Sequence, residues 1–200
     1  MDVVISSAVL VLASIPMAIL SVVIRVKIGS PIIFKQLRPG KDATLFYMYK
    51  FRTMTDERDA NGEMLPDKYR MTPFGTWLRS TSLDELPELV NVLKGDMSLV
   101  GPRPLLERYM PFYTRDEMIR FHVRPGITGK AQLNGRNTAT WEQRLSDDIE
   151  YVETLSLAGD VAILAKTVLG VLQRRGFEVD PQRLMADLDV ERQERVERAD

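Results

Sequence analysis

The sequence predicts an α/β fold that is mostly helical, with a short β element. Three observations lead to this prediction. An uncharged apolar run of 22 residues, from Val3 to Ile24, lies near the N-terminus. The aromatic-rich segment Leu45 to Met54 alternates with the period of a β-strand. In the second half of the chain, acidic and aromatic residues recur at helical spacing from Trp141 to Leu155, and apolar residues do so from Asp160 to Arg175.

Length and composition narrow the chemistry that this chain can carry. A chain of 200 residues suits one domain with a substantial core. We expect a membrane segment at 1–28, a main domain at 29–176 and a charged tail at 177–200. The absence of cysteine excludes disulfides, thiolate zinc sites and cysteine nucleophiles. His122 is the only histidine, which argues against a multi-histidine metal site and a Ser-His-Asp triad.

The apolar run is long enough to enter or cross a membrane. As a helix, Val3 to Ile24 would extend about 33 Å, which is sufficient for a bilayer core. Pro16 bends such a helix because it cannot donate to the carbonyl of Leu12. The segment therefore either crosses the bilayer with a kink or turns back to the face that it entered.

A basic segment follows the apolar run. Residues 25–58 contain eight basic and three acidic side chains, which gives this segment a net charge of +5. Under the positive-inside rule, these cations place the downstream part of the chain in the cytoplasm. Because the segment adjoins a membrane-like helix, we expect anionic lipid headgroups or a phosphorylated substrate as partners, and no nucleic acid.

Two short extended segments precede the central motif. Ile32 to Phe34 reads as a strand, and Arg38-Pro39-Gly40 reads as a turn before the segment from Leu45 to Met54. Alternation along that second strand sends Lys50 and Arg52 to the same face. Two cations on one face predict either a solvated strand edge or an anion clamp, and the local sequence does not separate these alternatives.

The segment Ser82-Leu83-Asp84-Glu85 places two adjacent carboxylates near the start of a short apolar helix. Ser82 and Glu85 match the capping-box pattern, which needs no catalysis to explain it. If Ser82 capped the helix, however, Pro87 would fall in the second turn and cost a backbone hydrogen bond. A later start would leave the carboxylates on the entry loop as a functional dyad. From these four residues alone, the cap and the dyad are equally good interpretations.

Helices are expected through the rest of the chain. Glu107 to Phe121 predicts an amphipathic helix whose regularity Pro111 limits. The helix predicted from Trp141 to Leu155 is expected to pack on the core. The segment from Asp160 to Arg175 is apolar almost all round, so it is either a buried helix or an amphipathic helix in the membrane interface. The Arg- and Glu-rich tail after Pro181 is expected to be a solvated or partner-binding helix.

Five blocks of sequence combine into a recognisable pattern. In order and spacing they resemble the small monotopic phosphoglycosyl transferases, a group of bacterial sugar transferases, over about residues 2 to 175. The resemblance is strongest to the minimal members that start protein N-glycosylation or surface-glycan assembly. The blocks are Lys50-Phe51-Arg52-Thr53-Met54, Ser82-Leu83-Asp84-Glu85-Leu86-Pro87, the run from Gly95 to Pro104, Arg124-Pro125-Gly126-Ile127-Thr128-Gly129 and Gly135-Arg136-Asn137.

The resemblance implies transfer of a sugar-1-phosphate from a UDP-sugar to a polyprenol phosphate, such as undecaprenyl phosphate, with release of UMP. It implies that Asp84 is the nucleophile that forms a covalent phosphosugar intermediate. Glu85, with Asp84 beside it, would hold Mg²⁺, which prefers oxygen ligands and bridges diphosphate oxygens.

A dianionic diphosphate must be screened before a carboxylate can attack it, so cations are required around the substrate. Guanidinium groups suit bidentate phosphate contacts, and Lys50 would act as a point charge. Pro102 and Pro104 restrict the backbone around Arg103 and fix its direction. The expected substrate-binding residues are Lys50, Arg52, Arg79, Pro102, Arg103, Pro104 and Arg136.

The resemblance also implies a topology and partners. The family's first segment is a re-entrant helix-break-helix that penetrates one leaflet, which would make this a monotopic protein of the bacterial inner membrane facing the cytoplasm. The family's break is usually an adjacent Ser-Pro pair, whereas this chain has Ser14-Ile15-Pro16. The expected partners are a UDP-sugar, a polyprenol phosphate, the phospholipid membrane and downstream glycosyltransferases.

Two other function classes share these features. A membrane-tethered, Mg²⁺-dependent phosphohydrolase could use the same groups with water as the acceptor. A non-catalytic membrane-bound binding module would share the basic segment and the apolar helix, but it would not require Asp84, Glu85 and Arg103 together. The identity of the sugar, the oligomeric state and the role of the tail do not follow from the sequence.

Overall fold

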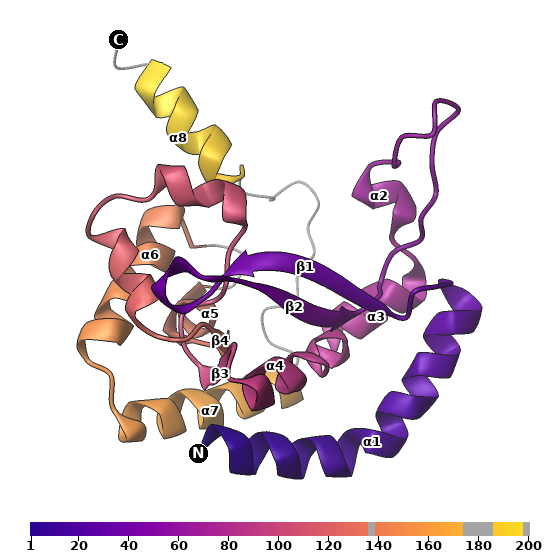
Figure 1. The fold of residues 1–200 in the computed structure, drawn as a ribbon, viewed down its shortest axis with the longest axis horizontal. Helices are drawn as coiled ribbons and strands as arrows, with labels where there is room; N and C mark the ends of the chain where they lie inside the picture. The colour runs from indigo at the N-terminus through magenta and orange to yellow at the C-terminus, as the bar shows by residue number, and fades with distance from the viewer. Residues whose placement is uncertain (136–138, 174–185, 198–200) are drawn as a thin grey trace. The chain divides into compact units, whose positions relative to one another are not determined.

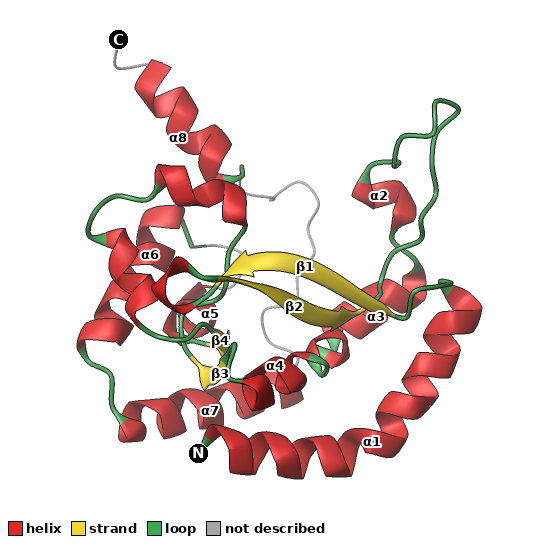
Figure 2. Cartoon of the chain, in the orientation of Figure 1, coloured by secondary structure: helices red, strands yellow, loops and turns green. Residues whose placement is uncertain are grey.

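The computed structural model describes residues 1–135, 139–173 and 186–197. It is mostly helical with two small sheets, so the predicted α/β class is confirmed (Figure 2). The described chain divides into two compact units. Unit 1 comprises Met1–Gln36 and Met48–Lys94, and unit 2 comprises Leu37–Tyr47 and Gly95–Asp200.

Unit 1 contains the N-terminal helix and the segment around Asp84. Its helices are α1 (Asp2–Lys27), α2 (Asp67–Arg70), α3 (Pro73–Ser80), the 3₁₀ helix η2 (Leu83–Glu85) and α4 (Glu88–Lys94). Strands β1 (Ile33–Pro39) and β2 (Leu45–Phe51) form a two-stranded sheet and contribute to both units. The predicted strands are therefore present. The first strand continues through Arg38 and Pro39, which were predicted to form a turn, and the connection is the following segment with η1 (Lys41–Ala43).

Unit 2 contains a parallel pair of short strands, β3 (Ser98–Val100) and β4 (Gly126–Thr128), with Ser98 opposite Gly126 and Val100 opposite Thr128. Its other helices follow in chain order, and Figure 1 labels those that are α-helical. They are η3 (Glu107–Phe112), η4 (Glu117–His122), α5 (Lys130–Gly135), α6 (Trp141–Glu153), α7 (Leu157–Leu172) and α8 (Leu188–Glu197).

Helix α1 is one continuous helix that contains Pro16, and it bends partway along its length (Figure 1). It is the one helix among the described residues that is long and apolar enough to cross a membrane, and only 11% of its most apolar window is buried. Ser14 Oγ donates to the carbonyl of Val11, not to that of Leu12, which Pro16 leaves without its helical donor. The residues nevertheless remain helical on both sides of the proline.

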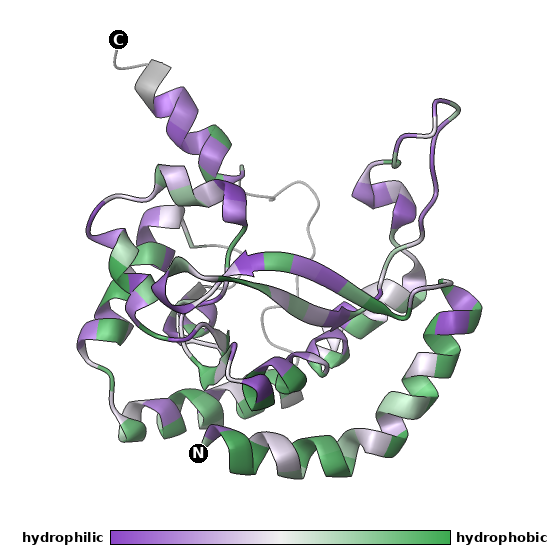
Figure 3. Ribbon diagram, viewed as in Figure 1, coloured by the Kyte–Doolittle hydropathy of each residue, from purple (hydrophilic) through white to green (hydrophobic). Residues whose placement is uncertain are grey.

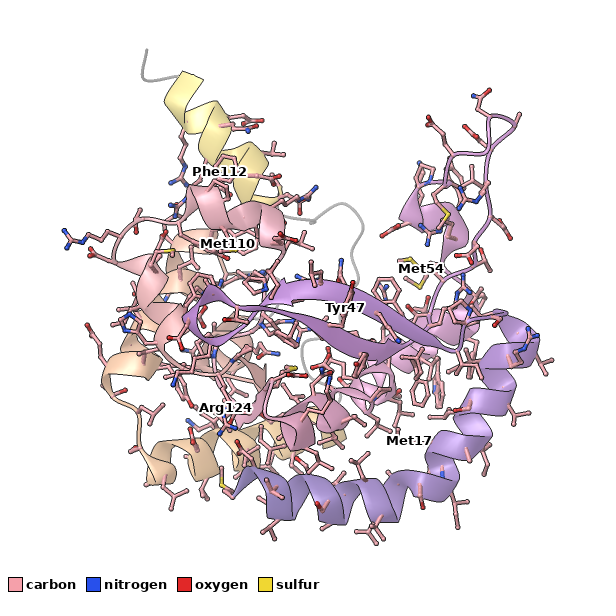
Figure 4. The ribbon with its side chains drawn as sticks, viewed as in Figure 1. Met17, Tyr47, Met54, Met110, Phe112 and Arg124 are labelled. Carbon is pink, nitrogen blue, oxygen red and sulfur yellow. The ribbon has the colours of Figure 1, made fainter. Side chains whose placement is uncertain are left out.

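One face of α1 packs on the core of unit 1. Leu20, Ile24 and Ile28 are buried together with Phe51 of β2 and Leu78 of α3. Met17, which Figure 4 labels on α1, packs against the same cluster. The opposite face carries large exposed apolar side chains, including Leu12 at 80% exposure, and Figure 3 shows α1 as mainly hydrophobic. Helix α1 thus combines a protein-facing side with a side suited to lipid.

Helix α3 lies unusually close to the end of β2. Thr72 caps the helix by accepting from Gly75 N at 2.9 Å, and Pro73 takes the first turn, where its missing N–H costs nothing. A Cβ at Gly75 would lie 1.8 Å from the carbonyl oxygen of Thr53, which is a severe backbone clash. Gly75 therefore permits the close approach that brings Arg79, one turn further along α3, to Thr53.

The segment from Glu107 to Phe121 is not the single amphipathic α-helix that its composition predicted. It forms η3 and η4 with a break between them. Thr114 N donates to Glu117 Oε2 at 2.7 Å, and Glu117 N lies 3.3 Å from Thr114 Oγ1. These reciprocal bonds have the pattern of a capping box, which starts a new helical turn at this point and ends the first one.

The helix predicted at Trp141 to Leu155 is confirmed as α6, capped by Thr140, which accepts from Gln143 N. Helix α7 begins slightly before the predicted start and is capped by Ser156. Its Leu157, Val168 and Leu169 side chains are exposed, so its interpretation as a buried core helix is wrong. Thr167 of α7 lies 2.8 Å from Thr128 of β4, between hydroxyl oxygens, so α7 is tied to the parallel strands within unit 2.

Helix α8 is part of the packing of unit 2. Leu188 is fully buried in a cluster with Tyr109, Trp141 and Leu145. Arg192 forms a two-pronged ion pair with Glu117 and donates to the carbonyl of Phe112, which Figure 4 labels beside α8. The helix predicted in the tail is confirmed as α8, which is mostly hydrophilic (Figure 3) and exposed or half-buried along most of its length, but it is docked on unit 2 through Leu188 and Arg192 and is not solvated all round.

Candidate active site

The predicted carboxylates lie in η2 of unit 1, between two leucines that anchor this short element. Leu83 and Leu86 both pack against the core cluster around Leu78. Asp84, between them, is only 6% exposed. The two leucines supply the apolar burial that fixes η2, and this holds the backbone of the acidic pair between them in place.

Ser82 does not form the predicted capping box. Its backbone is left-handed, with φ 55°, and its side chain makes no capping hydrogen bond. An N-cap residue normally has an extended backbone, so this conformation directs the hydroxyl away from the amides it would have to satisfy. Helix α4 begins at Glu88, directly after Pro87, so the proline disrupts no helical hydrogen bond. The structure thus removes the structural explanation for Glu85 as a capping residue.

Glu85 instead pairs with Lys50 of β2. Lys50 Nζ lies 2.7 Å from Glu85 Oε1 and 3.1 Å from Glu88 Oε1. The Glu88 side chain is 1% exposed, whereas that of Glu85 is 20% exposed. A single ammonium therefore bridges one partly accessible and one fully buried carboxylate. Sequence reasoning overlooked Glu88, although its position three residues after Glu85 could have indicated that the two share a side of the chain.

Asn91 fixes the position of α4 relative to β2. This fully buried side chain accepts a hydrogen bond from Tyr49 N at 3.0 Å through Oδ1. Tyr49 directly precedes Lys50, so the bond sets the register between the lysine and the carboxylates of η2 and α4. Buried polar side chains of this kind are satisfied by specific partners, which makes such contacts directional.

Arg52 and Arg79 bind groups of the protein itself. The guanidinium of Arg52 donates to the carbonyls of Met54 and Ser30 and pairs with Asp56, and its hydrogen bond is the main cause of a lowered pKa for the Asp56 carboxyl. Arg79 Nε donates to Thr53 Oγ1 at 3.0 Å. Arg52 is thus buried in a structural role, and Arg79 is held beside the end of β2. Their assignment to substrate binding stays a prediction.

In unit 2, β3 runs directly into the segment Gly101-Pro102-Arg103-Pro104. Gly101 N donates to Thr128 O, and the carbonyl of Pro102 accepts from Gly126 N at 3.0 Å. Side chains of Cβ size would collide with backbone at Gly101, Gly126 and Gly129, with contacts of 2.1 to 2.5 Å. The glycines therefore allow this segment to pack directly on the end of β4. Arg136, predicted to bind substrate, lies outside the described residues.

Two arginines bind the carbonyls of Arg103 and Pro104. Arg38 Nη1 donates to Pro104 O at 3.3 Å, and Arg120 Nη2 donates to Arg103 O at 2.6 Å. Arg120 is itself buried and pairs with Asp148 of α6 at 3.0 Å. Burial raises the pKa of Asp148 to about 6, against the opposing effect of Arg120. Burial, and then the charge of Arg103, lower the pKa of Arg144, so the Arg103 charge acts on α6.

The donor chemistry fits Mg²⁺ in part. No group of three or more acidic or histidine side chains gathers as a metal site among the described residues. Mg²⁺, however, is commonly held by one or two carboxylates together with substrate phosphates and water. Glu85, whose side chain is 20% exposed and lies directly after Asp84 in the chain, supplies the right kind of ligand. These residues would hold Mg²⁺ together with substrate phosphates and water, and not by protein ligands alone.

Comparison with known proteins identifies relatives. The family model described as bacterial sugar transferase matches residues 1–174. The chain is 54% identical over 156 residues to the uncharacterized sugar transferase EpsL of Bacillus subtilis, covering 78% of this chain and 77% of that protein. It is 34% identical to the exopolysaccharide production protein ExoY of Rhizobium meliloti, covering 88% of this chain and 85% of that protein.

A longer relative is the undecaprenyl-phosphate galactose phosphotransferase of Salmonella typhimurium, which is 39% identical over 192 residues. The match covers 88% of this chain but 40% of that enzyme, so the chain corresponds to less than half of its length. The family resemblance predicted from the five sequence blocks is confirmed. The chain belongs to the bacterial sugar transferase family.

Proposed function

We propose that this protein transfers a sugar-1-phosphate from a UDP-sugar to a polyprenol phosphate, releasing UMP. The observation that carries the proposal is the buried Asp84 next to the Lys50-bridged carboxylates, in a chain of this family. Two relatives support the choice of substrates. They are the Salmonella galactose phosphotransferase and a UDP-glucose:undecaprenyl-phosphate glucose-1-phosphate transferase of Xanthomonas campestris, which is 38% identical over 169 residues.

The reaction proceeds in two displacements on phosphorus. An Asp84 carboxylate oxygen attacks the phosphorus that bears the sugar, the bond from that phosphorus to the UMP oxygen breaks, and UMP leaves with the bonding electron pair. An oxygen of the lipid phosphate then attacks the same phosphorus and displaces Asp84. The product is a sugar linked to the lipid through a diphosphate, and the carboxylate is regenerated.

The residues around Asp84 prepare it for this role. Lys50 supplies positive charge close to the point where an anion must approach an anion, and at short range this lowers the electrostatic barrier. Glu88 holds Lys50 from the buried side, which leaves Glu85 at the accessible side as the proposed ligand of Mg²⁺. When bound, Mg²⁺ would neutralise charge on the diphosphate. Arg79 and Arg103 are proposed to contact substrate phosphates.

The reaction is proposed to take place at the cytoplasmic face of the inner membrane, where the lipid phosphate lies. The exposed apolar sides of α1 and α7 support membrane contact. For α1 we propose the re-entrant, monotopic topology. It is supported by the buried residues at both ends of the helix, Ser6 and Ile24, and by the packing of α1 against α4 in the same unit. A straight transmembrane span would carry one end away from the unit.

Topology is testable by labelling. A single cysteine at position 2, in an otherwise cysteine-free chain, is expected to react with a membrane-impermeant maleimide in inverted membrane vesicles and to be protected in intact spheroplasts. A cysteine at position 59, in the loop before α2, serves as the cytoplasmic reference. If position 2 reacted in spheroplasts while position 59 did not, α1 would span the bilayer and the re-entrant proposal would fail.

The proposed activity is tested by incubating purified protein with undecaprenyl phosphate, Mg²⁺ and each of a set of UDP-sugars, and measuring UMP and lipid-linked product. We expect equal amounts of UMP and lipid-linked product with at least one UDP-sugar. Without undecaprenyl phosphate, we expect at most one UMP per enzyme molecule and no lipid-linked product. Free sugar phosphate without lipid product would indicate the hydrolase. The absence of any reaction with every UDP-sugar would indicate a binding module.

A further inference from the structure

The backbone carbonyl of Arg103 is bound by another arginine. Arg120, on η4, donates through Nη2 to Arg103 O at 2.6 Å, and the same nitrogen lies 3.0 Å from Asp148 Oδ2 on α6. Its other terminal nitrogen, Nη1, donates to the hydroxyl of Tyr113 at 2.6 Å. The Arg120 and Asp148 side chains are 4% and 7% exposed. The guanidinium is therefore immobilised by three partners from different parts of unit 2.

The contact between Arg120 and the Arg103 carbonyl adds to the restriction that the two prolines place on the Gly-Pro-Arg-Pro segment. Pro102 and Pro104 fix their own φ angles, and Gly126 N holds the carbonyl of Pro102. Pro104 confines the ψ angle of Arg103 to the extended region but leaves it a range of about 40° there, and movement within that range shifts the Arg103 carbonyl relative to its side chain. A charge-assisted hydrogen bond to that carbonyl removes this freedom, and such bonds are stronger than neutral ones.

We propose that Arg120, oriented by Asp148, is a positioning residue that sets the direction of the Arg103 guanidinium for substrate phosphate binding. The inference rests on the proposed function, because it assumes that Arg103 contacts the substrate. Arg120 itself touches no substrate. Its buried location and its three protein partners leave it no accessible face for one.

Replacing Arg120 with lysine distinguishes the effect of positioning Arg103 from the effect of the positive charge of Arg120. Arg120→Lys keeps the positive charge opposite Asp148, but an ammonium lacks the planar fork that reaches Asp148, Tyr113 and Arg103 together. We expect the KM for the UDP-sugar to rise at least tenfold with kcat changed less than threefold. Misplacing a binding group by about 1 Å is sufficient for an effect of this size or larger.

Arg192→Lys is the matched control. Arg192 also pairs with a buried carboxylate, Glu117, and also donates to a backbone carbonyl, that of Phe112, in the same unit. These contacts of Arg192 are with η3 and η4, not with residues 101–104. We expect Arg192→Lys to lower the thermal unfolding temperature about as much as Arg120→Lys does, with KM unchanged. Equal KM values for the two variants would overturn the positioning role.

A double-mutant cycle links Arg120 to Arg103. In an Arg103→Ala background, Arg120→Lys is expected to leave KM unchanged, because the group that it positions is gone. If Arg120→Lys raised KM tenfold in both backgrounds, Arg120 would act independently of Arg103 and the inference would fail. If Arg103→Ala alone left KM unaffected while the wild type still released UMP, the substrate-binding role of Arg103 would fail and the transferase proposal would stand.

Asp148→Asn provides a second route if Arg120→Lys does not fold. The substitution keeps the volume and removes the charge that holds Arg120 Nη2, so a several-fold rise in KM is expected. An unchanged KM in folded Asp148→Asn protein would contradict the orienting role of Asp148. The substitution leaves the buried Arg120 guanidinium without its counter-charge, so we expect a lower unfolding temperature. Because the asparagine oxygen, the Tyr113 hydroxyl and the Arg103 carbonyl can still accept from Arg120, we expect the variant to fold at neutral pH.

Discussion

Replacing Asp84 with asparagine is expected to reduce UMP release by at least a thousandfold while leaving the protein folded. Asparagine preserves the volume of this buried side chain but cannot attack phosphorus, and the loss of a covalent nucleophile removes the reaction path itself. The measurement is single-turnover UMP release with a UDP-sugar that the wild type accepts. The wild-type protein should also retain labelled sugar phosphate after denaturation, and Asp84→Asn should retain none.

Asp147→Asn is a suitable control for that experiment. Asp147 is another buried aspartate, it lies in unit 2, and the hydrogen bond that its Oδ1 accepts from Asn134 can also be accepted by an asparagine oxygen. Its turnover is expected to stay within a few-fold of wild type. Substantial lipid-linked product from Asp84→Asn, with an unfolding temperature equal to that of the wild type, would refute the assignment of Asp84 as nucleophile.

Replacing Lys50 with methionine is expected to reduce both stability and activity. The substitution removes the cation between Glu85 and Glu88 and leaves the fully buried Glu88 carboxylate opposite an apolar chain. Breaking a buried ion pair from one side costs about 3–5 kcal/mol in the free energy of unfolding. We expect a loss of that order in denaturant titrations, together with at least a hundredfold loss of turnover, because the charge facing the reacting anions is gone.

The double variant Lys50→Met/Glu88→Gln distinguishes the two effects. Glutamine removes the uncompensated negative charge, so most of the unfolding free energy should return, whereas turnover should remain low. If turnover returned together with stability, Lys50 would act only by holding the fold. If Lys50→Met alone had wild-type stability, the pairing of Lys50 with Glu88 would contribute nothing, and the buried carboxylate would have to be stabilised in another way.

The sequence predicted elements whose signals are local. The helical spacing from Trp141 onwards predicted α6 nearly as it is observed, and the uncharged run predicted α1. The segment around Pro111 differs because two reciprocal hydrogen bonds between Thr114 and Glu117 compete successfully with a continuous helix. The same Ser/Thr-x-x-Glu pattern fails at Ser82, where the backbone is left-handed and Glu85 has a tertiary partner.

The candidate site was predictable as far as residue types and motif spacing allow. Asp84, Glu85 and Lys50 were identified, but the pairing of Lys50 with Glu88 requires a strand and a helix to meet, which periodicity alone does not reveal. Arg120 and Asp148 are 28 positions apart in the sequence and carry no motif signal of their own. Their connection to Arg103 is a property of packing, so only the structure could reveal it.

The docking of α8 shows that the end of the family match and the end of the packed unit are different positions in this chain. The family model ends at residue 174, yet Leu188 completes the cluster around Trp141, and Arg192 clasps Glu117. The inherited module and the cooperative folding unit therefore end at different residues. Part of the packing of unit 2, the cover over Tyr109 and Trp141, therefore comes from residues that the family match does not include.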